Sequence, residues 1–121
     1  MFITAVILSV VLALVSLGAG APKALLKGPA AEQLSGRGLS ASLIRFIGGA
    51  EVAGAAGLLI GLAWHPLGIA AAIGLLIVFI GATVFHARNG DYANSETRGA
   101  SLPSVVLAIV SLAVIITLAA A

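Results

Sequence analysis

Residues 67–87 read LGIAAAIGLLIVFIGATVFHA and form a long apolar run. No Asp, Glu, Lys or Arg interrupts it, and as an α-helix it spans about 30 Å, which matches the hydrocarbon core of a bilayer. Leu, Ile and Ala dominate it, without the apolar–polar alternation that is typical of a strand. The stretch therefore predicts a transmembrane helix.

Three further apolar stretches of similar length lie around it, at about residues 2–21, 43–63 and 102–120. Hydrophobic residues make up 61% of the 121-residue chain and charged residues only 8%, against about 25% charged in a soluble domain. A soluble domain of this size cannot hide so much apolar surface. We predict an all-α fold, an integral membrane four-helix transmembrane bundle that forms a single domain over residues 1–121.

The first stretch is predicted to be a retained helix. Small residues at 18–21 resemble a signal-peptide cleavage site, but no Lys or Arg precedes the apolar core. The apolar run is also longer than that of a usual signal peptide.

The connections contain the expected turn and cap residues. In the first, Ala30 to Leu34 can form one helical turn at the membrane interface. In the second, Trp64 and His65 are interpreted as structural, and Pro66 suits the first turn of the third span.

The third connection is polar, and it is predicted to contain the end of the third span and the start of the fourth. Gly90 is predicted to end the third span as a left-handed residue. Ser101 is predicted to cap the fourth span, with Pro103 just inside it.

The charges favour one orientation. All six Lys and Arg lie in or beside the first and third connections: Lys23, Lys27, Arg37, Arg45, Arg88 and Arg98. The positive-inside rule then places loops 22–42 and 88–100 in the cytoplasm and both termini outside. We expect a multi-pass protein of the plasma membrane.

Several classes of function are excluded by composition. The chain has no cysteine, so it carries no disulfide, thiolate metal site or thiol relay of its own. Two His on opposite sides and scattered acids predict no metal site. A net charge of +2 is no footprint for nucleic acid. No Ser has a neighbouring His or acid to activate it, so no catalytic residue is predicted.

Small residues predict how the helices pack. Helices in lipid associate by close backbone approach. The second span has a stripe at four-residue spacing: Gly49, Ala53, Gly57 and Gly61. The first span offers a similar face: Ser9, Ala13, Ser16 and Gly20. The stripe of the second span favours packing within the chain, and the alternative is an interface with a second copy or a partner subunit.

Glu51 is the most informative residue, because an ionisable group deep in a membrane helix is expensive and usually has a partner. It either ties helices together or contacts a proton, quinone or other ligand. His86 either pairs with the carbonyls that end its own helix or shares a site with Glu51. Lys23 and Arg45 either extend toward lipid phosphates or reach Glu51. Arg45 and Glu51 point in different directions around one helix, so we expect the partner of Glu51 on another helix.

The chain resembles the DoxX-like family of small membrane proteins. The resemblance is carried in order by PKAL at 22–25, RFIGGAE at 45–51, and GATVFHAR at 81–88 followed by Gly90 and Asp91. It implies a four-helix bundle with a shared polar set of Lys23, Arg45, Glu51 and His86. Some members of that family are linked to thiosulfate:quinone oxidoreduction, some to oxidative-stress membrane complexes, and distant ones to chaperone or cargo-receptor roles.

Two hypotheses about function follow. In the first, the chain is an accessory or scaffold subunit of a larger membrane assembly, with other membrane protein subunits or further copies of itself as partners. In the second, it is a quinone- or lipid-binding component of a membrane redox system, with Glu51 and His86 as polar anchors. The chain carries no cofactor motif, so we do not expect it to catalyse a reaction on its own. A quinone is the one cofactor that the second hypothesis implies.

Overall fold

The computed structural model describes residues 1–121 and contains five α-helices: α1 Phe2–Ala24, α2 Gly28–Gly36, α3 Ala41–Ile60, α4 His65–Arg88 and α5 Ser95–Ala120. Four of them, all except α2, are long and apolar enough to cross a membrane. The predicted all-α fold with four membrane-spanning helices is therefore confirmed. The structure adds α2, a nine-residue helix where one turn was expected.

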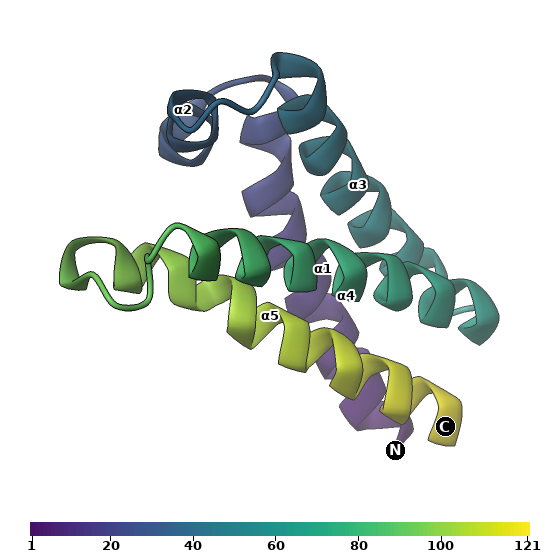
Figure 1. Cartoon of the computed structure of the whole chain (residues 1–121). Helices are drawn as coiled ribbons and strands as arrows, with labels where there is room; N and C mark the ends of the chain where they lie inside the picture. Colours follow the sequence, from purple (N-terminus) through teal and green to yellow (C-terminus); the bar gives the residue numbers. More distant parts are fainter.

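The four long helices form a ring, in which α1 packs on α3, α3 on α4, α4 on α5 and α5 on α1. Both chain termini lie at the same end of the bundle (Figure 1). From the short turn that joins them, α3 and α4 diverge, and α2 lies on the diverging side (Figure 1). The core between the helices is built from fully buried aliphatic side chains, including Leu12, Leu58, Leu75 and Val114.

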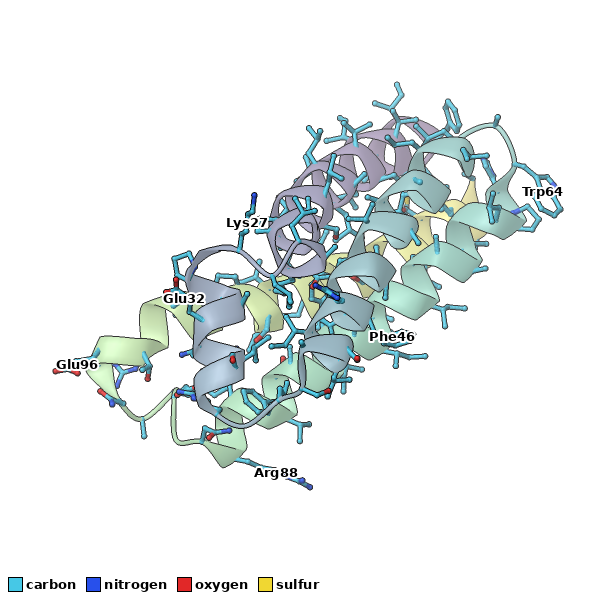
Figure 2. The ribbon with its side chains drawn as sticks, turned by 90° about the horizontal axis from the view of Figure 1, so that it is seen from above. Lys27, Glu32, Phe46, Trp64, Arg88 and Glu96 are labelled. Atoms are coloured by element: carbon cyan, nitrogen blue, oxygen red, sulfur yellow. The ribbon has the colours of Figure 1, made fainter.

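The outer surface of the bundle is apolar. Only 25 of 121 residues are buried, and large hydrophobic side chains are exposed on every long helix, such as Leu14, Phe46, Ile77 and Ile116. A soluble monomer rarely exposes apolar surface on this scale. Phe46 extends away from the bundle in Figure 2, where acyl chains would surround it. Lipid is therefore the solvent for this surface.

The two ends of the bundle differ in charge. Lys27, Glu32, Arg88 and Glu96 all lie toward one end, whereas Trp64 extends from the opposite end (Figure 2). The charged end contains α2 and the connection between α4 and α5. We call it the loop end.

Glycines bring α1 and α3 into close contact near the loop end. An added Cβ at Gly48 would lie 2.5 Å from the carbonyl oxygen of Gly20, and one at Gly20 would lie 2.7 Å from the carbonyl oxygen of Gly48. Because the obstructing atoms belong to the backbone, no side-chain adjustment relieves the overlap. The face of α1 predicted from Ser9, Ala13, Ser16 and Gly20 is buried throughout.

The predicted stripe on α3 is divided between two environments. Gly57 and Gly61 contact Ala71 and Gly68 of α4, whereas Gly49 and Ala53 are exposed. Residues four apart overshoot a full helical turn by about 40°, so a stripe at this spacing winds around the helix. Consequently its first half faces lipid and its second half faces α4, and the close contact with α1 falls to Gly48.

The neighbouring glycines of α3 give a matched stability test. We expect Gly48→Ala to destabilise the protein by about 1–3 kcal/mol, the usual cost of overpacking, because its methyl group meets the α1 backbone. Gly49→Ala meets nothing within 4 Å and should be neutral or stabilise by up to about 1 kcal/mol through helix propensity. Thermal unfolding in detergent micelles, followed by circular dichroism, measures both. Equal midpoints for the two variants would contradict the packing described here.

The helix ends correct one prediction and confirm two. The cap of α5 is Asn94, whose side chain accepts a hydrogen bond from the backbone N–H of Glu96 at 2.9 Å. The prediction that Ser101 caps this helix was wrong, because the helix begins before its apolar part. The first turns of α5 are polar, so hydropathy does not reveal them, and Glu96 in the first turn stabilises that helix end. Gly90 has a φ of 72°, and Pro66 lies in the first turn of α4, as predicted.

Candidate functional site

All five helices line one large cavity, which lies at the loop end of the bundle and has a volume of about 780 Å³. Most of its wall is apolar. Its polar or charged side chains are Lys23, Gln33, Glu51, His86 and Ser104. Three of the four residues that the sequence singles out for ligand binding therefore line the same cavity.

The first polar wall is an ion pair between two helices. Lys23, in the last turn of α1, donates a hydrogen bond from Nζ to Glu51 Oε1 of α3 at 2.6 Å. The helices can bring these groups together because Gly20 and Gly48 allow the two backbones to touch. The expectation that Glu51 finds its partner on another helix is confirmed.

The ion pair uses only one of the two oxygens of the Glu51 carboxylate. Glu51 is fully buried, and its Oε2 has no hydrogen-bond partner within the protein. A buried acceptor without a donor costs free energy, so proteins rarely leave one unpaired. Since Glu51 lines the cavity, a donor located there would complete its hydrogen bonding.

The second polar wall is centred on Asp91, which follows α4 and is buried. Arg37, just after α2, donates two hydrogen bonds to it, from Nη1 to Oδ2 at 2.5 Å and from Nη2 to Oδ1 at 2.6 Å. His86 Nδ1 lies 2.5 Å from Asp91 Oδ2. The Arg37 guanidinium also lies 5.6 Å from the centre of the Phe85 ring, which lines the cavity. Arg37, His86 and Asp91 form what we call the latch, because they join the end of α2 to the end of α4.

The hydrogen bonds of the latch favour the charged forms of Asp91 and Arg37. Hydrogen bonds from Arg37, and then from His86, hold the pKa of Asp91 well below its usual range, although burial opposes them. The same bonds raise the pKa of Arg37. An ionised Asp91 can only accept a hydrogen bond, so His86 Nδ1 carries the proton and donates to it, and the hydrogen bond between His86 and Ser101 Oγ uses the same nitrogen. Nε2 is therefore the ring nitrogen free of protein partners.

The connection between α4 and α5 supports the latch through further hydrogen bonds. The Tyr92 hydroxyl lies 2.8 Å from Ser104 Oγ and donates to the Ser101 carbonyl at 3.2 Å. Arg98 Nε donates to the carbonyl of Tyr92 at 2.7 Å, and Thr97 Oγ1 donates to the carbonyl of Asp91 at 2.9 Å. These bonds fix the backbone that carries Asp91 over the start of α5.

The fourth predicted residue, Arg45, lies elsewhere. It is exposed on α3 and does not line the cavity. Glu51 and His86 share the cavity but have no hydrogen bond with one another, since each is held by its own partner. The two walls therefore present separate polar groups to whatever occupies the space between them.

Arg37 and Asp91 are the two residues that sequence reasoning missed. Arg37 is predicted only as one of the positive charges that set the orientation, and Asp91 is named only as a residue that carries the family resemblance. A signal was available, because two spans separate the first and third connections, so both lie at the same end of the bundle, and each residue directly follows a glycine. Nothing in the sequence distinguishes Arg37 from Lys27 as the cation that pairs with Asp91.

A comparison with known protein families places the chain in one of them. The model of the DoxX-like family matches residues 7–114, which include both polar walls. No curated protein and no solved structure was found to match the chain significantly. A family match over nearly the whole chain is sufficient to place it: the chain belongs to the DoxX-like family.

Proposed function

We propose that this DoxX-like membrane protein binds a lipid-soluble molecule with a hydrogen-bond-donating head, of the quinol class, in the cavity at the loop end. The observation that supports the proposal is the unpaired Oε2 of Glu51, a fully buried acceptor at the wall of an apolar cavity. A volume of about 780 Å³ lies within the usual range for small-molecule sites.

The proposed ligand follows from the chemistry of the two walls. A hydroxyl donor satisfies Glu51 Oε2, while the Lys23 ammonium holds the other carboxylate oxygen in place. His86 offers Nε2 from the second wall, because Asp91 engages Nδ1. An apolar ring or chain fits the rest of the lining. The proposed role is binding, and no chemical step is assigned to the chain alone.

A tryptophan inside the cavity would report binding. In a Trp64→Phe background, Phe85→Trp places the only tryptophan at the cavity wall and retains an aromatic ring under Arg37. We expect a short-tailed benzoquinol to quench its fluorescence. The paired change Lys23→Met with Glu51→Met should weaken quinol binding about tenfold, the value of one charge-assisted hydrogen bond.

The control is Glu96→Gln, which removes an exposed acid that does not line the cavity and should leave the affinity unchanged. The absence of quenching, or equal affinities with and without Glu51, would count against the proposal. A long-chain alcohol with a single hydroxyl serves as a competitor. If it displaces the quinol at equal concentration, the site recognises a lipid hydroxyl and not a quinol ring.

A second role, as an accessory subunit of a larger membrane assembly, is supported by one feature of the surface. Gly49 and Ala53 of α3 are exposed, and Gly74 of α4 is exposed with nothing near it. Exposed small residues allow a helix of another chain to approach closely. Purification in mild detergent tests this role, and a monomer without partners would weigh against it.

We further propose the orientation in which the loop end is cytoplasmic and both termini lie outside the plasma membrane. Every Lys and Arg belongs to the helix ends and connections of that side. Labelling of a cysteine introduced at Ser42 in intact cells tests the orientation, since an impermeant reagent should not reach it.

A further inference from the structure

Exposed residues that also line the cavity reveal where it opens. One opening lies between α3 and α4, where Ile77 is 66% exposed and Gly81 is also exposed. Ile47 of α3 lines the opposite side of this opening. We call it the lateral mouth. A second opening lies at the loop end, where exposed residues of α2 and α5 line the cavity: Pro29, Ala30, Ala100 and Pro103.

The lateral mouth results from how α3 and α4 pack. Toward the Trp64 turn the two helices are in close contact, with Gly54 against Leu75 and Gly61 against Gly68. Farther from that turn the two helices diverge (Figure 1), and an added Cβ at Gly81 would meet nothing within 4 Å. The close glycine contacts therefore form the floor of the mouth, and its rim is apolar.

The depth of the lateral mouth places it in the hydrocarbon region. Ile77 precedes the end of α4 at Arg88 by about 16 Å and Gly81 by about 10 Å, at 1.5 Å per residue. Exposed side chains at this depth contact acyl chains, not water. A molecule dissolved in the bilayer can reach the cavity here without leaving lipid.

The loop end, by contrast, is partly covered by α2. Four residues of α2 line the cavity, and the latch joins Arg37 to Asp91 with two hydrogen bonds. The latch also places the Arg37 guanidinium against Phe85 at this end. Access from water requires α2 to move or a molecule to pass between Ala30 of α2 and Ala100 of α5.

We propose that the cavity is loaded sideways from the bilayer through the lateral mouth, and that α2 and the latch close it toward water. This inference rests on the proposed function for its ligand, and it specifies the class of that ligand. The ligand is amphiphilic: its polar head occupies the cavity, and its apolar tail extends through the lateral mouth into the lipid. A water-soluble metabolite without a tail does not fit this route.

Thiol labelling tests the route without any ligand, because the natural chain has no cysteine. Ser104→Cys places a thiol on the buried wall of the cavity. In proteoliposomes, a bilayer-partitioning phenylmaleimide should label it at least about tenfold faster than a sulfonated maleimide present on both sides, because an apolar mouth disfavours the charge. A cysteine at exposed Ser42 should react readily with both reagents.

Two glycines of α4 provide a matched pair for the decisive comparison. Gly81→Trp should slow phenylmaleimide labelling of the cavity thiol by about tenfold, because the indole fills the lateral mouth. Gly74→Trp adds the same side chain at an exposed position of the same helix that does not line the cavity, and should change nothing. If Gly81→Trp fails to fold, Ile47→Trp narrows the same mouth from α3.

Either of two results would overturn the inference. Equal labelling by the sulfonated reagent would show that water reaches the cavity freely. Slower labelling in Ala100→Trp, with no effect of Gly81→Trp or Ile47→Trp, would place the route at the loop end. Loss of quinol binding with an intact labelling pattern would refute the proposed ligand and leave the lateral route standing.

Discussion

Replacing Lys23 with Met should destabilise the protein by about 3–5 kcal/mol, the largest effect that we expect from a single substitution. Lys23 is the only partner of a fully buried carboxylate, since Glu51 Oε2 is already unpaired. Without the ammonium, both oxygens of Glu51 lack a donor inside the bundle. The free energy of unfolding, measured by denaturant titration in micelles, should show this loss.

Replacing Glu51 with Met should reduce the free energy of unfolding by less than replacing Lys23 does. In Glu51→Met the orphaned group is Lys23, whose side chain is 17% exposed and ends a helix near the membrane surface. Its long aliphatic stem allows the ammonium to reach water or lipid phosphates. We expect this asymmetry because only one member of the pair can leave the protein interior.

The double variant with Met at positions 23 and 51 tests whether Lys23 and Glu51 stabilise the protein as an ion pair or independently of one another. Met at both positions replaces a buried pair with apolar groups of similar volume, a change that is often neutral or stabilising. We therefore expect Lys23→Met with Glu51→Met to be more stable than Lys23→Met alone by at least about 2 kcal/mol. Additive losses would mean that the two side chains do not depend on each other. The same double variant removes the acceptor in the binding test while retaining the fold.

Much of the fold could be predicted from the sequence, because each span is nearly free of charge and long enough to cross a bilayer. Hydropathy locates apolar segments but not helix ends. The predicted start of the fourth span therefore lies near Leu102, whereas α5 begins at Ser95. The polar first turns of that helix lie beyond the apolar signal. The length of α2 was underestimated for the same reason. Gly28–Gly36 contains helix-breaking residues and only one buried residue, Ala31, so it lacks a strong apolar pattern.

The candidate site was predictable to the extent that its groups are unusual for their surroundings. Glu51 and His86 stand out because ionisable residues are rare within membrane spans. Arg37 and Asp91 lie in polar connections, where a charge is ordinary, and they are 54 positions apart in the chain. Their pairing depends on how α2 folds back over the bundle, and one sequence alone does not encode that in a local pattern. Arg45 had the right residue type, but the helix turns it outward.

The second large effect concerns the latch and its dependence on pH. Asp91→Asn removes the charge that accepts two hydrogen bonds from Arg37 and one from His86. Charge-assisted hydrogen bonds are stronger than neutral ones, so we expect the midpoint of thermal unfolding to fall by on the order of 5 °C at pH 7. Glu96→Gln, at an exposed position in the first turn of α5, is the matched control and should leave the midpoint nearly unchanged.

The pH dependence of that difference identifies its cause. The pKa of Asp91 is lower in the folded protein than its usual value, chiefly through Arg37, so the unfolded chain binds the proton more tightly. The latch therefore contributes its full stability above pH about 4, the ordinary range of an Asp, and loses it as the pH falls further. The gap between the wild type and Asp91→Asn should be constant from pH 7 to about 5 and should shrink toward pH 3. A gap that stays constant down to pH 3 would mean that Asp91 acts through packing and not through its charge, and the latch would then not be an electrostatic closure of α2.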